Sequence, residues 1–172
     1  MCITPNEPRK NSRNFKTLVA HLRQFSISDS QEEIVAEWEH LRFWECAIVG
    51  VCRCSKAGIV EHNAITHKAT GLVVEPIGSS CIRLFPEDMQ TEFKGARDSY
   101  MLNKRTRIAS MKVGWGKHAH LTFLQLALQD AQYAQWLLSI SKYTTKTRHA
   151  CFHPDNKEIR KLLKKGIEQN RT

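Results

Sequence analysis

The sequence lacks an apolar run long enough to cross a membrane: none of its 172 residues belongs to a stretch approaching the roughly 18 consecutive apolar residues that a membrane helix requires. Its N-terminal stretch, MCITPNEPRKNSRNFK, contains no apolar core of a secretion signal. Acidic residues are scarce as well, 17 against 26 lysines and arginines. We therefore expect a cytoplasmic protein without a membrane partner.

Two catalytic signatures are also missing. Residues 113–117 (VGWGK) lack the spacing and the following Ser or Thr of a loop that binds nucleoside triphosphates. A two-metal nuclease needs several carboxylates that converge, whereas the acidic residues here concentrate in segments 31–45 and 86–88. An enzyme is therefore the less favoured class. A nuclease with an unrecognised site stays an alternative, because a Cys/His nucleophile pair leaves no spacing to test.

What the sequence does contain is the composition of a folded protein, with 41% hydrophobic and 25% charged residues. It also contains six cysteines. In a chain without a secretion signal these are not expected to form disulfides, because the cytosol keeps thiols reduced. Metal binding and burial in the core are the two uses that remain.

The positive charge is unevenly distributed along the chain. Residues 31–93 hold 5 basic and 10 acidic side chains, whereas residues 94–117 hold 7 basic side chains against Asp98 alone. Residues 142–172 hold 9 basic against 3 acidic side chains. A concentrated positive field attracts polyanions and favours DNA or RNA as the partner, the alternative being an ordinary solvated surface.

The first helices are predicted from apolar spacing. Residues 14–25 place apolar side chains on one face of a short helix. A second helix is expected from Ser30, an N-cap with Glu33 three positions on. Its apolar face would continue through Trp38 and Leu41.

Strands are predicted next. Residues 44–52 are β-branched and apolar and residues 59–67 alternate, which indicates an antiparallel hairpin. A third strand over 72–77 and a helix over 78–85 complete an α+β module spanning residues 30–93.

The second half of the chain predicts a helical module after a charged linker. Residues 94–110 have little apolar periodicity, which is typical of an exposed basic arm. After a short strand over 111–115, two helices broken near Asp130 are expected. A last, basic helix would be capped by Asp155. The core candidates of the paired helices are Leu124, Leu128, Tyr133, Trp136 and Leu137.

Three cysteines form the candidate metal site. Cys52 and Cys54 stand at the foot of the hairpin and Cys81 opens the helix after the third strand, so folding can bring the thiols together. A tetrahedral zinc site needs a fourth ligand, for which His62 is favoured, with His67 and Cys46 as alternatives. Such a closed site is structural, because it leaves no position for substrate.

This stretch resembles a small module of phage and large-virus proteins. The pattern is a Cys pair, a hairpin ending in Thr-Gly, and Ile-Gly-Ser-x-Cys-Ile before an aromatic residue. Here it covers about 35 residues, within CRCSKAGIVEHNAITHKATG and IGSSCIRLF. The chain departs from the pattern at Ser55, where glycine is usual, and at Asn63, where many members have another cysteine. The resemblance implies a zinc-binding module.

The stretch VGWGKHAHLTFLQLALQDAQYAQWLL resembles the C-terminal module of exodeoxyribonuclease X-like proteins. His120 stands where that pattern has a second glycine, so the turn is expected to be rebuilt. Backbone N–H groups beside the Lys117 ammonium can hold a phosphate without reading a base. Trp115 can stack on a base or cover the fold, whereas Tyr133 and Trp136 are expected to be core residues. The resemblance covers no catalytic half and so implies no nuclease activity.

Together these observations predict an α+β protein with a zinc-stabilised hairpin module, flanking helices and a mostly helical second module. The predicted organisation is a basic N-terminal segment with a short helix (1–29), a zinc-binding module (30–93), a basic linker (94–110), the exodeoxyribonuclease X-like module (111–145) and a basic C-terminal helix (146–172).

The predicted function is that of a nucleic-acid-binding accessory protein with a structural zinc ion, encoded by a phage or mobile element and acting in the host cytoplasm. The alternative is an interaction factor that inhibits or recruits a host or phage protein through its acidic segment 31–45 or its basic tail. The residues expected to contact nucleic acid are Lys104, Arg105, Arg107, Lys112, Trp115, Lys117, Lys161, Lys164 and Lys165.

Overall fold

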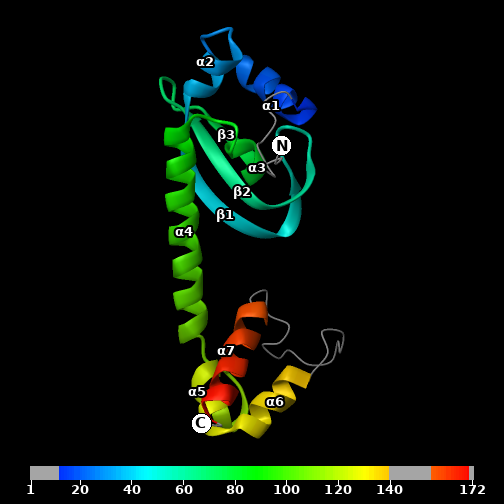
Figure 1. The fold of residues 1–172 in the computed structure, drawn as a ribbon, viewed down its shortest axis with the longest axis vertical. Coiled ribbons are helices and arrows are strands. Elements are labelled where there is room, and N and C mark those ends of the chain that lie inside the picture. The colour runs from blue at the N-terminus through cyan, green and yellow to red at the C-terminus, as the bar shows by residue number, and fades with distance from the viewer. Residues whose placement is uncertain (1–11, 140–155, 171–172) are drawn as a thin grey trace, which may run out of the picture. The chain divides into compact units, whose positions relative to one another are not determined.

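The computed structural model describes residues 12–139 and 156–170, and the chain divides into two compact units, unit 1 (Met1–Tyr100) and unit 2 (Met101–Thr172) (Figure 1). The architecture is α+β, as predicted. Residues 1–11, 140–155 and 171–172 lie outside the described residues. They belong to the predicted segments 1–29, 111–145 and 146–172 and include the proposed helix cap Asp155. No helix in the described ranges is both long enough and apolar enough to span a bilayer.

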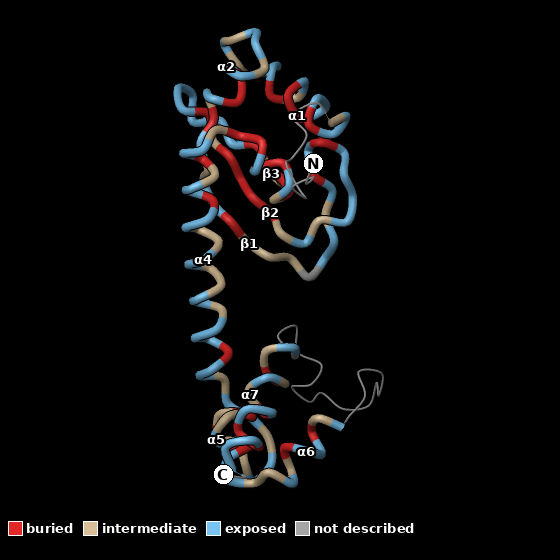
Figure 2. Tube along the Cα trace, viewed as in Figure 1, coloured by how far each residue is buried: buried red, intermediate tan, exposed pale blue. Residues whose placement is uncertain are grey.

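Unit 1 is built around a three-stranded antiparallel sheet in the order β1-β2-β3. Its elements are α1 (Arg13–Arg23), α2 (Gln31–Ala36), β1 (Trp38–Val51), β2 (Ala57–His67), β3 (Val73–Gly78), α3 (Ser79–Ile82) and the first part of α4 (Glu87–Ser110). The predicted hairpin and third strand are confirmed. In register, His62 pairs with both Trp44 and Gly78. The second half of β2 is almost wholly buried, which makes it the centre of the core (Figure 2).

The helix predicted to continue from Ser30 through Trp38 and Leu41 is wrong beyond its first turns. The Ser30 hydroxyl does cap α2 by accepting the N–H of Glu33, but the helix ends at Ala36 and Trp38 begins β1. The segment from Trp38 is rich in aromatic and β-branched residues, which fit a half-buried strand. Leu41 falls at an irregularity of β1 and is 49% exposed.

A buried histidine ties the β2–β3 turn to the start of β1. The backbone N–H groups of Ala69 and Thr70 donate to Nδ1 of His67, at 3.2 and 3.3 Å, so Nε2 carries the proton and donates to Glu37 at 3.0 Å. Burial opposes ionisation of Glu37, but hydrogen bonds from Ser28, Ile27 and His67 together lower the pKa of its carboxyl to about 2. This network fixes the turn that follows β2.

The segment expected to be a linker, residues 94–110, is helical throughout and forms most of α4. The helix contributes to both cores: Phe93 packs against Phe43 of β1 at 6.0 Å between ring centroids, whereas Ile108 belongs to the buried cluster of unit 2. Between Phe93 and Ile108 no residue is buried. This gap explains why the apolar period of a helix was not visible in the sequence.

Unit 2 is helical, with η1 (Gly116–His118), α5 (Phe123–Gln129), α6 (Ala131–Ser139) and α7 (Asn156–Gln169) following the end of α4. The predicted break at Asp130 is confirmed. The short strand expected over 111–115 is reduced to one bridge between Lys112 and Thr122. Leu128 and Trp136, predicted as core, are 40% and 46% exposed, whereas Leu137 is buried.

The helices of unit 2 approach closely at Gly166. A Cβ atom on Gly166 of α7 would lie 2.5 Å from Cβ of Ala127 in α5. Real Cβ atoms do not approach that closely, so only glycine permits this crossing. The remaining core is apolar and made of Ile108, Val113, Leu121, Phe123, Leu126, Ala134, Leu137, Ile159, Leu163 and Ile167.

Candidate functional site

Cys52, Cys54 and Cys81 lie together in unit 1 and are all buried. The turn after β1 carries the first two, and the short helix α3, which begins directly after β3, carries the third. The three Sγ atoms lie within 4.8 Å of one another, and those of Cys52 and Cys81 are 3.8 Å apart. The cluster can hold a metal ion. We refer to these three residues as the cysteine cluster.

The backbone of the turn shapes the cluster. The N–H of Cys52 donates to the carbonyl of Lys56 at 2.9 Å, and the N–H of Ser55 donates to the carbonyl of Cys52 at 2.8 Å. Ser55 adopts φ 69°, in the left-handed region that favours glycine. This tight turn places both thiols on the same side.

Backbone amides point at the first thiol of the cluster. The N–H of Gly78 donates to Sγ of Cys52 at 3.2 Å and the N–H of Cys54 does so at 3.5 Å. The thiol of Cys81 and these amides lower the pKa of Cys52 to about 5. The hydrogen bond to Cys52, burial and the neighbouring thiolate raise the pKa of Cys81, and burial raises that of Cys54.

The lowered pKa of Cys52 and the raised pKa values of Cys54 and Cys81 have one electrostatic consequence. A first thiolate forms readily at Cys52, but two further thiolates in a buried site repel it and one another. Only a nearby cation offsets that repulsion, so ionisation of all three thiols is coupled to metal binding.

The structure does not bring His62, the predicted fourth ligand, into the cysteine cluster. Its Nε2 lies 3.1 Å from the carbonyl oxygen of Ile59, and its ring packs against Trp44 at 5.4 Å. The ring covers Gly50, where a Cβ atom would lie 2.7 Å from it. The two alternatives are not in the cluster either: His67 is hydrogen-bonded to Glu37, and Cys46 of β1 is not grouped with Cys52, Cys54 and Cys81.

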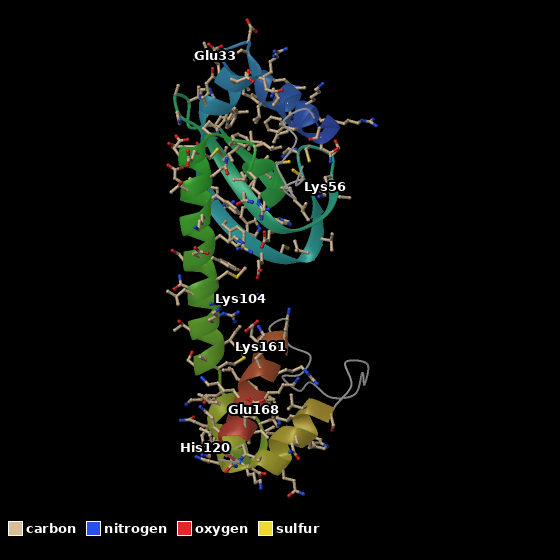
Figure 3. The ribbon with its side chains drawn as sticks, viewed as in Figure 1. Glu33, Lys56, Lys104, His120, Lys161 and Glu168 are labelled. Carbon is tan, nitrogen blue, oxygen red and sulfur yellow. The ribbon has the colours of Figure 1, made fainter. Side chains whose placement is uncertain are left out.

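Two hollows border the cysteine cluster. One, of about 210 Å³, is lined by Ile59, Glu61 and Ser79 besides the cluster, and the other, of about 220 Å³, by Ser12 and Phe15. Cys54, Cys81, Lys56 and Ser80 line both hollows. Lys56 lies in the turn next to the sulfur atoms (Figure 3). Residues of the cluster therefore line both hollows of unit 1.

A second arrangement lies in unit 2, at the predicted Gly-Lys turn. Gly114 and Gly116 adopt φ 80° and 60°, so the turn uses these two glycines for left-handed backbone. His120 does not adopt positive φ. The turn is therefore unstrained at His120.

Asp130 joins this turn to α6. One carboxylate oxygen accepts the N–H of Tyr133 at 2.9 Å, and the other lies 3.1 Å from Nε2 of His118 and 3.4 Å from Nζ of Lys117. Lys117 is exposed, but the carboxylate compensates part of its charge. Sequence reasoning missed this role of Asp130. The residue precedes a predicted helix by one position, which was the available signal for an N-cap.

The predicted nucleic-acid contacts all fall in unit 2. Lys104, Arg105 and Arg107 lie on α4, and Lys161, Lys164 and Lys165 lie on α7 (Figure 3 labels Lys104 and Lys161). Exposed side chains are Arg105, Arg107, Lys112, Lys117, Lys161, Lys164 and Lys165. Trp115 is half-buried against the core, and its Nε1 donates to the Tyr133 hydroxyl at 3.2 Å.

The charge divides sharply between the two units. Unit 2 carries 14 lysines and arginines against 4 aspartates and glutamates, a formal net charge of +10. Unit 1 carries 12 against 13, a formal net charge of −1. The net positive charge of the protein is therefore carried by unit 2.

Among residues 12–139 and 156–170, the cysteine cluster is the one place where three or more histidine, cysteine or acidic side chains bring their ligand atoms close enough to hold a metal ion. Comparisons with protein-family models, with curated proteins and with solved structures find no match to this chain.

Proposed function

We propose that this protein binds nucleic acid through the basic surface of unit 2, while a zinc ion at the cysteine cluster stabilises unit 1. The observation that carries the proposal is the segregation of charge, since a net charge of +10 within 72 residues produces a field that favours phosphate backbones. An accessory protein encoded by a phage or mobile element fits both this surface and the two sequence resemblances.

The lysines of α7 supply the most regular part of this surface. Lys157, Lys161 and Lys164 recur every three or four residues on the face opposite the buried Ile159 and Leu163. At a rise of about 1.5 Å per residue, the first and third lysines are about 10 Å apart along the helix. That distance corresponds to about three phosphates along one strand. Such contacts position a nucleic acid without reading its sequence.

Zinc is the metal that best suits the cysteine cluster. Thiolates are soft ligands, and two thiolates bound at about 2.3 Å to a tetrahedral ion lie about 3.8 Å apart. The Sγ atoms of Cys52 and Cys81 are separated by 3.8 Å. Three buried cysteines that join a turn to α3 indicate a structural role, because the metal would tie together segments 27 residues apart in the sequence.

The test combines metal analysis with binding measurements at several salt concentrations. The wild-type protein is expected to contain one zinc ion per chain and to bind labelled DNA or RNA with an affinity that falls as salt rises. The double variant Lys164→Ala/Lys165→Ala should lower the log–log slope against salt by about 1.4 to 1.8, since each phosphate contact contributes about 0.7 on a single strand and about 0.9 on a duplex. The matched control is Arg13→Ala/Lys16→Ala, which removes two exposed cations from α1 of unit 1 and should leave the slope unchanged.

Equal slopes for the two double variants would contradict the assignment of binding to unit 2. Zinc without any nucleic-acid affinity would favour the alternative, a factor that binds a host or phage protein. The acidic segment 31–45 of that alternative does not form one helix, because α2 ends at Ala36 with Glu37 as its C-cap, and Glu39 and Glu45 lie on β1.

A further inference from the structure

A row of aromatic rings crosses the surface of unit 2 beside the Gly-Lys turn. The ring of His118 lies 5.1 Å from that of Tyr133, and the ring of Tyr133 lies 5.1 Å from that of Trp136, with interplanar angles of 46° and 37°. Trp115 anchors the row by donating its N–H to the Tyr133 hydroxyl and by packing on Phe123 at 6.1 Å. We call His118, Tyr133 and Trp136 the aromatic row.

The inner end of the row is fixed and the outer end is exposed. Hydrogen bonds hold His118 to Asp130 and Tyr133 to Trp115. Trp136, one helical turn after Tyr133, is 46% exposed. The core positions of α6 are filled by Ala134 and Leu137, which are buried. Trp136 therefore presents a large ring to solvent from a rigid support, without being needed to fill the core.

Cations flank both ends of α6. At one end Lys117, whose side chain is 76% exposed, contacts Asp130 immediately before the helix. At the other end the guanidinium of Arg160 donates to the carbonyl of Leu138, two residues after Trp136. An aliphatic partner would bring nothing to complement these charges. A polymer that alternates flat rings with phosphates complements both features.

We infer that Trp136 stacks on a base of single-stranded nucleic acid, an inference that rests on the proposed function. In a duplex both faces of each base are already stacked on neighbouring bases, so only a single strand offers a free face to the exposed ring of Trp136. The lysines and arginines of unit 2 hold the phosphates on either side of the stacked base. Stacking is tolerant of sequence, since every base has a π-face.

The expected effect follows from the energy of one stacked base. Alanine substitution of a stacking aromatic costs about 1–3 kcal/mol, so Trp136→Ala should weaken single-strand binding about tenfold. The salt slope should not change, because no phosphate contact is lost. Trp136→Phe should retain most of the affinity. Leu128→Ala, which removes a 40% exposed apolar side chain from α5, is the matched control and should leave the affinity unchanged.

The experiment titrates the full-length wild-type protein and these three variants with labelled oligo-dT of about ten nucleotides, near the middle of known single-strand site sizes, and with a blunt duplex of the same length. Thermal unfolding checks that each variant keeps the stability of the wild type. Quenching of tryptophan fluorescence by oligo-dT, present in the wild type and reduced in Trp136→Phe, reports on the stack itself.

The outcomes separate the inference from the function on which it rests. Tighter binding of the single strand, with a loss confined to Trp136→Ala and an unchanged salt slope, supports the inference. If the wild type binds both nucleic acids but Trp136→Ala binds as well as Leu128→Ala does, or if the duplex is preferred, the stacking inference fails and the proposed function stands. If neither nucleic acid is bound, the proposed function fails and the inference with it.

Discussion

Substitution of Cys81 by serine tests the metal centre most directly. The change removes one of three converging thiols, the one whose Sγ lies 3.8 Å from Sγ of Cys52. A serine hydroxyl is a poor zinc ligand, so the variant should resemble wild-type protein from which the metal has been removed.

The magnitude follows from linkage between binding and folding. Free zinc at 1,000 times its dissociation constant stabilises the folded state by about 4 kcal/mol. For a unit of about 100 residues, 1 kcal/mol corresponds to roughly 4–8 °C in the unfolding midpoint, so loss of zinc should lower the transition of unit 1 by roughly 15–30 °C. The transition of unit 2, which contributes no residue to the cluster, should not move.

Calorimetry with and without a zinc chelator, together with metal analysis, provides the assay. Cys46→Ser is the matched control, because Cys46 is a half-buried cysteine of the same unit outside the cluster. It should keep both the metal and the transition. The reasoning is refuted if the wild-type protein contains no zinc, or if chelation leaves the transition of unit 1 where it was.

Three further changes test the packing, the turn and the hydrogen-bonded carboxylate of Glu37. Gly166→Ala should destabilise unit 2, because the new Cβ would meet Ala127 at 2.5 Å. The control Gly95→Ala in α4, where a Cβ would have nothing within 4 Å, should stabilise the protein by about 0.5–1 kcal/mol. Equal effects of the two substitutions in chemical denaturation would disprove the close crossing. Ser55→Gly should raise the stability of unit 1 by up to about 1 kcal/mol, since φ there is 69°, and a lower midpoint would argue against that turn. Glu37→Gln should cost about 2 kcal/mol at neutral pH, because the part-buried hydrogen bonds from Ser28 and His67 lose a charged acceptor. The folded-state pKa of Glu37, about 2, lies below its ordinary 4.5, so this difference should be complete above pH 4.5 and shrink as pH falls towards 2; a difference independent of pH would exclude the carboxylate as its source.

The parts of the fold that could be predicted are those where a short-range pattern and the tertiary structure agree. Apolar and polar residues alternate over 59–67, and this segment lies in β2, whose second half is buried. The predicted break at Asp130 coincides with the junction of α5 and α6. At Trp38 they disagree, since the apolar spacing suits a helix but the indole packs on His67 across the sheet at 5.2 Å. Long-range pairing decides such a segment, and sequence spacing does not report it.

The candidate site was predictable in part for a similar reason. Cys52 and Cys54 are close in sequence, and strand order brings Cys81 to them, so the cluster follows from topology. The histidine could not be placed in the same way. Which face of β2 carries the His62 ring depends on bulges in the β1 and β3 pairings, at Glu45/Gly50 and at Asn63/Ile65. A single bulge reverses which side chains face each other.

The helix α4 has a consequence for how this protein can be divided or recombined. Phe93 belongs to the core of one unit and Ile108 to the core of the other, on one uninterrupted run of helical hydrogen bonds. A gene fragment that ends before Phe93 would leave unit 1 without its anchoring side chain, and one that starts after Ile108 would leave unit 2 without its own. A break between Phe93 and Ile108, where no residue is buried, keeps each anchoring side chain with its own unit, so this stretch of α4 is where the two units can be exchanged with other proteins.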